Sequence, residues 1–294
     1  MARIVLGTVQ FGVKYGINNT SGQVNQEEVE TILKLAKQND VVTLDTSSAY
    51  GTSEQVLGKA LKRTGLDFDV VSKYPKSEKG VRDSFKKSLC DLGLDSLYGY
   101  LVHHFDFYQE YPGIYDEMHR LKDEGCIKKI GFSIYNPLQL QYLLDRNVQF
   151  DIIQFPYNIF DRQFEPWLPI LKDAEVEVHT RSAFLQGLFF MNPLAIEGKL
   201  KPLCSYLERL HSYCMKRSIS VEQLAFGYVL NNENVDGALI GIDNHQQFEK
   251  NVEVSKFVLR DEDVDFIHSI NIKEKDLLNP VNWKKHECNR FIQT

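Results

Sequence analysis

Short apolar runs alternate along most of this chain with longer segments that have helical periodicity. The run at residues 4–6 is followed by Val29, Ile32 and Leu33, whose spacing places them on one face of a helix. Asn25 precedes that segment and is a favourable N-cap residue. Short continuous apolar runs are typical of strands buried on both faces of a parallel sheet. The pattern therefore predicts buried strands, each followed by an amphipathic helix.

The alternation predicts eight strand–helix units. We expect strands at residues 4–6, 41–45, 68–73, 98–103, 129–133, 150–155, 176–181 and 237–240. We expect helices at about residues 26–36, 53–63, 81–92, 112–124, 164–172, 203–216, 221–230, 244–252 and 262–270, and another that begins at Pro137 after the cap residue Asn136. Thr52-x-x-Gln55 and Ser220-x-x-Gln223 both match a capping box. Residues 186–200 are expected to form a long loop.

Eight such units without a linker favour one α/β domain over residues 1–294. The count and length fit a (β/α)8 TIM barrel, a parallel eight-stranded barrel, here with extra C-terminal helices. A doubly wound open sheet is the competing architecture. It usually has fewer units, and the GxGxxG fingerprint expected after its first strand is missing from this sequence.

Composition and charge exclude several classes of partner. The chain is 43% hydrophobic and 25% charged, and its net charge of −6 is spread without a basic cluster, so we expect no nucleic acid or membrane partner. Its five cysteines are scattered without metal-ligand spacing, so we expect reduced thiols and no metal. Met1 leads directly into a strand and no apolar run could span a bilayer, which predicts a cytoplasmic protein.

Candidate chemistry gathers where the strands end. Asp45, Lys73 and His103 each follow an apolar strand, and Tyr50 lies on the loop after Asp45. In a parallel barrel such residues share one face. A phenol has a pKa near 10, which a neighbouring ammonium would lower, while a carboxylate would keep that ammonium charged. A histidine beside the phenol would hold a carbonyl oxygen, so the set suits proton transfer to an alkoxide, with hydride supplied by a cofactor.

These residues lie in a longer set of motifs that resembles the aldo-keto reductase family over nearly the whole chain. The motifs are Gly7-Thr8, Leu44-Asp45-Thr46-Ser47-x-x-Tyr50-Gly51-x-Ser53-Glu54, Ser72-Lys73, Tyr100-Leu101-Val102-His103, Ile130-Gly131-Phe132-Ser133, Gln154-x-x-Tyr157-Asn158, Arg181-Ser182 and Gln186-Gly187. The resemblance implies a barrel with an extended nicotinamide cofactor at its C-terminal face. It also implies that Tyr50 is the proton donor, Lys73 tunes it, Asp45 pairs with Lys73, and His103 orients the carbonyl. His104 is expected to be a rim or packing residue.

The resemblance extends to the cofactor site. It implies that Ser133 and Gln154 hydrogen-bond the nicotinamide carboxamide and that Arg181 stacks on the nicotinamide ring. The segment from Gly241 to Asn251 resembles the one that holds the adenosine half, with backbone N–H groups at a helix start for phosphate. The full expected cofactor-binding set is Gly7, Thr8, Ser133, Gln154, Arg181, Ser182, Gln186, Gly241, Asp243, Gln247 and Asn251.

The nucleotide preference is less marked in the sequence. NADP(H) is favoured by the family, with NAD(H) as the alternative. Gly241 and Gln247 stand where strongly NADP-selective members have lysine and arginine to pair with the 2′-phosphate. Lys250 is a nearby cation that would compensate, or else a solvated helix residue.

The expected function is hydride transfer between the cofactor and a small carbonyl/alcohol pair, such as an aldehyde, ketone or sugar-like substrate. Two alternatives remain open: a nicotinamide-binding regulatory subunit, and a lyase that forms a Schiff base on Lys73. We expect a monomer or weak homo-oligomer.

Three sets of residues are further candidates around the site. The apolar segment 184–191 is expected to form a pocket wall, a flap or a subunit interface. The aromatic residues of segment 105–111 are candidate pocket walls, and Trp283, His286 and Cys288 are candidates to reach over the barrel mouth.

Overall fold

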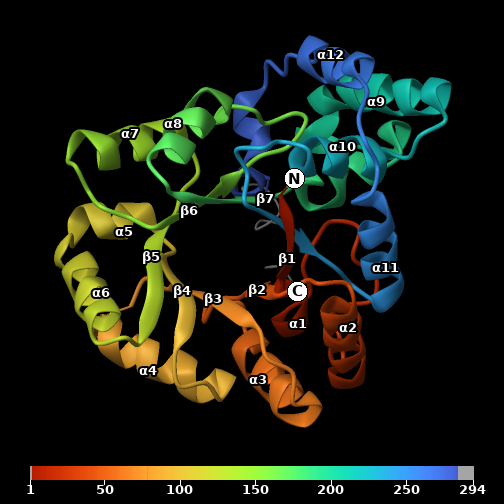
Figure 1. Cartoon of the computed structure of the whole chain (residues 1–294). Coiled ribbons are helices and arrows are strands. Elements are labelled where there is room, and N and C mark those ends of the chain that lie inside the picture. The colour runs from red at the N-terminus through yellow and green to blue at the C-terminus, as the bar shows by residue number, and fades with distance from the viewer. Residues whose placement is uncertain (1, 78, 284–294) are drawn as a thin grey trace, which may run out of the picture.

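Eight parallel strands close into a barrel in sequence order (Figure 1). The computed structural model describes residues 2–77 and 79–283, so His286 and Cys288 lie outside the described residues. The strands are β1 (Arg3–Gly7), β2 (Thr43–Asp45), β3 (Asp69–Tyr74), β4 (Leu97–Val102), β5 (Ile127–Ser133), β6 (Ile152–Pro156), β7 (Glu177–Arg181) and β8 (Gly237–Gly241). Each strand pairs with the next, and β8 pairs with β1. The predicted (β/α)8 barrel is confirmed.

Helices surround the strands on the outside of the ring (Figure 1). They are α1 (Val9–Gly12), α2 (Gln26–Gln38), α3 (Ser53–Thr64), α4 (Gly80–Leu92), α5 (Phe105–Glu110), α6 (Gly113–Asp123), α7 (Pro137–Asp145), α8 (Leu168–Asp173), α9 (Cys204–Arg217), α10 (Val221–Leu230), α11 (His245–Val254) and α12 (Asp261–Ser269). The short helices α1 and α5 were not predicted. None of the described helices is both long and apolar enough to cross a membrane.

Three of the predicted helix starts carry the caps that the sequence indicates. The side chains of Asn25 and Asn136 accept hydrogen bonds from backbone N–H groups in the first turns of α2 and α7. Ser220 and Gln223 form a complete capping box at α10. Each cap satisfies a backbone donor that the helix itself leaves free.

The capping box that Thr52-x-x-Gln55 matches in the sequence does not form. The Thr52 hydroxyl makes no cap hydrogen bond; it accepts from Gln23 Nε2 at 3.0 Å and lies 3.5 Å from the carbonyl oxygen of Gly12. The end of α1 packs directly on this helix start, because a Cβ built on Gly12 would lie 1.7 Å from the carbonyl oxygen of Tyr50. Tertiary packing at this glycine therefore redirects the threonine.

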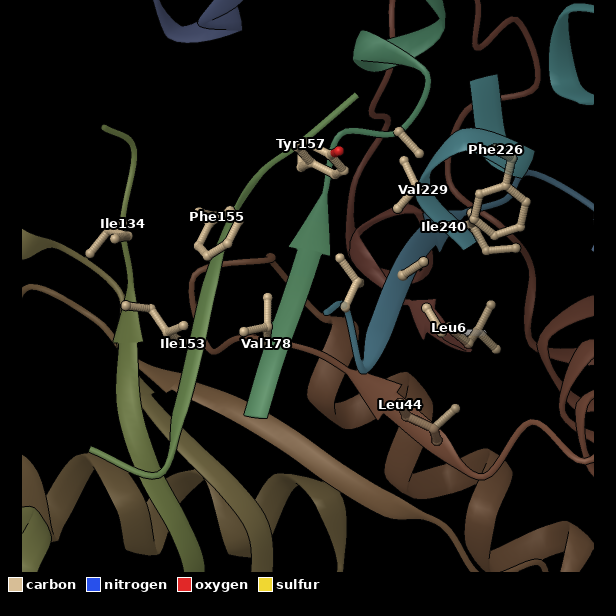
Figure 2. Packing of buried hydrophobic residues seen from close by; sticks show 14 of the residues in the cluster. Leu6, Leu44, Ile134, Ile153, Phe155, Tyr157, Val178, Phe226, Val229 and Ile240 are labelled. Carbon is tan, nitrogen blue, oxygen red and sulfur yellow. The ribbon is translucent and has the colours of Figure 1, made fainter. Parts of the chain in front are cut away.

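The hydrophobic core lies mainly between the barrel and its helices. Figure 2 shows side chains of alternate strand residues, such as Ile153 and Phe155, with Phe226 and Val229 of α10 in the same cluster. Val71, Leu101 and Ile152 form a separate small cluster. Because strand side chains alternate between faces, the residues two positions beyond Val71 and Ile152 also point into the barrel. They are Lys73 and Gln154.

The loop predicted at residues 186–200 contains three short 3-10 helices, η2 (Leu185–Phe190), η3 (Pro193–Ala195) and η4 (Gly198–Leu203). Two more follow α12, η5 (Lys275–Leu278) and η6 (Pro280–Asn282), and η1 (Glu165–Trp167) precedes α8.

Candidate active site

A cavity of about 820 Å³ is formed by residues at the C-terminal ends of the strands and by the loops that follow them. Every residue predicted to bind the cofactor lines it, and so do Asp45, Tyr50 and His103. Lys73 is completely buried and is not part of the lining. The barrel thus brings together residues as far apart in sequence as Gly7 and Asn251, because inward-pointing strand ends converge at one face.

Lys73 and Asp45 form a buried ion pair. Lys73 Nζ lies 2.5 Å from Asp45 Oδ1 and donates a second hydrogen bond to the carbonyl oxygen of Thr46 at 2.9 Å. The other carboxylate oxygen, Oδ2, accepts from Gln154 Nε2 at 2.8 Å. Burial lowers the pKa of Lys73, and the Asp45 carboxylate opposes that shift. A lysine held by two partners outside the cavity lining does not suit a Schiff-base nucleophile.

Tyr50 lines the cavity close to this ion pair. Lys73 Nζ lies 5.1 Å from the centre of the Tyr50 ring. Burial and then the Asp45 charge raise the pKa of Tyr50, and Arg181 acts in the opposite direction. This net direction differs from the lowering that the sequence predicted from Lys73, because burial disfavours the phenolate more than the neighbouring cations favour it. The phenol therefore keeps its proton.

His103 is held beside Tyr50 as a neutral imidazole. The two rings are nearly perpendicular, with their centres 5.8 Å apart. Burial, and then the nearby charge of Lys73, lower the pKa of His103 to about 2. His103 Nδ1 lies 3.1 Å from Ser47 Oγ, which itself accepts from the backbone N–H of Ala49 at 3.1 Å. We assign the Ser47 hydroxyl as the donor and Nδ1 as the acceptor of this hydrogen bond. The ring proton of His103 is then on Nε2, which can donate it in a hydrogen bond.

Ser47 was not among the predicted functional residues. Its only sequence signal is its place in the motif between Asp45 and Tyr50. His104, by contrast, is exposed, as expected of a rim residue.

Gln154 and Ser133 provide polar groups suited to an amide. Gln154 Oε1 is buried and has no hydrogen-bond partner among the described residues. Ser133 is buried next to it on the neighbouring strand, in register with Gln154. An orphaned acceptor that faces a cavity needs a donor. The carboxamide of a nicotinamide ring offers such a donor, so these residues fit that cofactor.

Arg181 has one face already covered. Its guanidinium carbon lies 4.2 Å from the centre of the Tyr135 ring, and it donates a hydrogen bond to the carbonyl oxygen of Ile134 at 3.2 Å. A stack of this kind fixes a planar guanidinium. The stacking on nicotinamide that we predict for Arg181 therefore has only the opposite face of the guanidinium available. Tyr135, which also lines the cavity, was not predicted.

A bridge between two loops borders the cavity. The backbone N–H of Ile17 donates to the carbonyl oxygen of Gln186 at 3.1 Å, and Asn18 Nδ2 donates to that of Gly187 at 2.6 Å. The segment after β1 thereby meets the segment after β7. The sequence did not predict this contact.

Only part of segment 184–191 forms a wall of the cavity. Phe184 and Phe190 line the cavity, whereas Leu188 and Phe189 are buried in the core.

The aromatic residues after β4 are not walls of this cavity. Phe105 and Tyr108 pack around Phe132 instead. At the other end of the described chain, Pro280 and Val281 reach the cavity, but Trp283 does not line it and donates its indole N–H to the carbonyl oxygen of Leu277.

The α11 end of the cavity is lined by Glu222, Gly241, Asp243, Gln247, Lys250 and Asn251. Asn244 caps α11 by accepting from the backbone N–H of Gln247 at 2.9 Å. Lys250, the cation that the sequence offers for a 2′-phosphate, is paired with Glu222.

The family model for the aldo/keto reductase family matches residues 3–272 of this sequence. The chain belongs to the aldo/keto reductase family. It is 26% identical to the aldo-keto reductase YhdN of Bacillus subtilis, over 95% of this chain and 92% of that one. It is 25% identical to the NADH-specific methylglyoxal reductase of Escherichia coli, over 90% of this chain and 92% of that one.

Solved structures agree on the fold. The holo form of the aldo-keto reductase AKR11C1 from Bacillus halodurans superposes with a TM-score of 0.72, at 23% identity, covering 92% of this chain and 94% of that one. As a member of the aldo/keto reductase family, the protein is an NAD(P)-dependent reductase that acts on small carbonyl compounds.

Proposed function

We propose that this reductase transfers hydride from a bound nicotinamide to a small aldehyde or ketone, while Tyr50 protonates the carbonyl oxygen. The observation that carries the proposal is the meeting of Tyr50, His103 and the Asp45–Lys73 pair at one end of a cavity that also offers the orphaned Gln154 amide oxygen. The bound cofactor would supply the hydride, and the residues of this chain would supply binding, orientation and the proton.

Each side chain has a defined task in the proposed reaction. His103 Nε2–H donates a hydrogen bond to the carbonyl oxygen and polarises it. As hydride reaches the carbonyl carbon, the C=O double bond becomes a C–O single bond and the oxygen takes the Tyr50 proton. The phenolate that remains is stabilised by the nearby Lys73 ammonium. The Asp45 carboxylate favours the charged form of Lys73. The reverse reaction would remove a proton from an alcohol through the same groups.

The raised pKa of Tyr50 supports the donor role in the reduction direction. A protonated phenol at neutral pH is ready to give its proton, but its pKa exceeds the value that favours rapid transfer. Substrate and cofactor binding must therefore strengthen the stabilisation of the phenolate in the transition state.

One relative supports a class of substrate. The methylglyoxal reductase of Escherichia coli, by its name, reduces a 2-oxoaldehyde and uses NADH. We infer that this chain reduces small aldehydes and ketones, including 2-oxoaldehydes, with sugar-like aldehydes as further candidates. The NADP(H) preference expected from the family stays a prediction. The carboxylates of Glu222 and Asp243 at the α11 end of the cavity argue for NAD(H) instead.

The test follows label from cofactor to product. Purified protein would be incubated with NADH or NADPH that carries deuterium at C4 of the nicotinamide, together with a panel of aldehydes and ketones. The proposal predicts an alcohol with deuterium on the former carbonyl carbon for at least one substrate. Nucleotide binding without turnover of any carbonyl would instead support the regulatory-subunit alternative.

A further inference from the structure

We infer that Glu222 makes this cavity select NAD(H) over NADP(H). The inference rests on the proposed nicotinamide cofactor and concerns the α11 end of the cavity. Glu222 lies in the first turn of α10, and Lys250 lies on α11. Lys250 Nζ lies 2.5 Å from Glu222 Oε1, and both side chains line the cavity.

The position of the adenosine follows from the position of the chemistry. Hydride and proton must reach neighbouring atoms of one carbonyl group, so the nicotinamide has to lie within reach of Tyr50 and His103. A dinucleotide is much longer than that subsite, and its adenosine must therefore occupy lining residues that belong to other elements. The α11 end provides such a place, because it is built by α10, α11 and the segment after β8.

The charges there do not suit a phosphate dianion. Arg181 and Lys250 are the only lysine or arginine side chains among the described lining residues, and Arg181 belongs to the catalytic end. Lys250 is already neutralised by Glu222. Asp243 adds a second carboxylate, which accepts hydrogen bonds from Asn19 Nδ2 at 2.8 Å and from Gln247 Nε2 at 3.3 Å. Two carboxylates therefore face one ammonium at this end.

Glu222 stays ionised in this setting. Burial would raise its pKa, but the hydrogen bonds from Lys250, Ser220 and the backbone, together with the Lys250 charge, outweigh burial and hold the pKa of the carboxyl below its usual value. The Glu222 side chain is 16% exposed, whereas that of Lys250 is 57% exposed. The carboxylate is thus fixed near the cavity wall, while its partner extends into solvent.

A fixed carboxylate distinguishes the two nucleotides by one group. NADH carries a ribose 2′-hydroxyl, which can donate a hydrogen bond to a carboxylate, and NADPH carries a 2′-phosphate, which a carboxylate repels. To accept the phosphate, the site would have to break the Glu222–Lys250 pair or bind a second negative charge beside it. Both routes weaken the binding of NADPH relative to NADH.

Gly241 is a less informative position for a test than Glu222. A Cβ built on Gly241 would lie 2.6 Å from both amide atoms of Gln10. A larger residue would have to displace that side chain, so its effect would mix charge with repacking.

The test compares dissociation constants for NADH and NADPH, measured by quenching of intrinsic fluorescence. Wild type is expected to bind NADH more tightly. Glu222→Gln removes the charge at nearly constant shape and frees Lys250, so the ratio of the NADPH to the NADH dissociation constant should fall by about five- to tenfold, the scale of one partly screened charge. Glu249→Gln makes the same charge change at an exposed α11 residue outside the lining and should leave the ratio unchanged.

Three kinds of outcome decide whether Glu222 selects NAD(H). A fall in the ratio for Glu222→Gln alone supports the inference, and high salt should reduce that difference. Tighter binding of NADPH than NADH by wild type, or equal shifts in both variants, would overturn it while leaving the proposed function intact. Failure of wild type to bind either nucleotide would overturn the proposed function itself.

Discussion

The hydrogen bond between Ser47 and His103 sets whether Nε2 of His103 presents an N–H group or a lone pair to the substrate. The Ser47 hydroxyl lies 3.1 Å from Nδ1, and the lowered pKa of His103 keeps the ring neutral, so the tautomer depends on this one contact. A neutral histidine in the wrong tautomer would present a lone pair to the carbonyl oxygen instead of an N–H. Ser47 is therefore a positioning residue.

Ser47→Ala is expected to lower kcat/KM for carbonyl reduction about tenfold, on the scale of removing a residue that orients a reactive histidine. The dissociation constant of the nucleotide should not change, since the Ser47 hydroxyl hydrogen-bonds, among the described residues, only with His103 and the Ala49 N–H and does not line the cavity. Ser48→Ala, which removes the neighbouring hydroxyl, serves as the matched control. Equal losses in both variants, or a weaker nucleotide affinity in Ser47→Ala, would contradict the positioning role.

At the scale of elements, a single sequence motif gives two different outcomes. Thr52-x-x-Gln55 and Ser220-x-x-Gln223 both match a capping box, but only the second one forms. At α10, Gln223 Oε1 accepts from the backbone N–H of Ser220 at 2.8 Å, and Ser220 Oγ accepts from that of Gln223 at 3.1 Å. The residues of α10 from Leu224 to Leu230 are buried, so fraying of its first turn would disturb the core.

Ser220→Ala is expected to reduce the free energy of unfolding by about 1 kcal/mol, the usual loss for an N-cap hydroxyl. Urea denaturation at neutral pH measures it, and Ser220→Thr, which keeps the hydroxyl, should recover most of the loss. If alanine and threonine behave alike, the cap hydrogen bond does not stabilise the helix.

The strand ends could be predicted from sequence because two local rules agree there. An apolar run shows where a strand stops, and the alternation of side chains shows which residues face inward, so Asp45, Lys73 and Gln154 were found. Residues set by contacts between distant elements were missed. Glu222 meets Lys250 only because α10 and α11 pack together, and Tyr135 meets Arg181 only because β5 and β7 end at the same face. Periodicity carries no signal for such pairs.

At the scale of the whole molecule, Asp161 gives a pH dependence of stability. Burial raises its pKa to about 6, although hydrogen bonds from Gln163 act in the other direction. The unfolded chain has an aspartate pKa near 3.9, so the folded state holds the proton more tightly. The stability that this proton contributes is present below about pH 4 and is lost as the pH rises through about 6.

Asp161→Asn is therefore expected to be more stable than wild type at pH 8, by at most about 3 kcal/mol. The gain should shrink as the pH falls towards 5, where the wild-type carboxyl is largely protonated. Urea unfolding at the two pH values measures it, and Asp67→Asn, at an exposed site, should show no such trend. A gain that is independent of pH would contradict the titration of Asp161.

The role of Tyr50 as proton donor is tested most directly by Tyr50→Phe. We predict that kcat for carbonyl reduction falls by about 10²–10⁴-fold, the scale of a positioned general acid, while the nucleotide dissociation constant stays the same. Tyr111→Phe, at an exposed residue outside the cavity lining, is the matched control and should turn over like wild type. Turnover by Tyr50→Phe at the wild-type rate would mean that Tyr50 is not the proton donor.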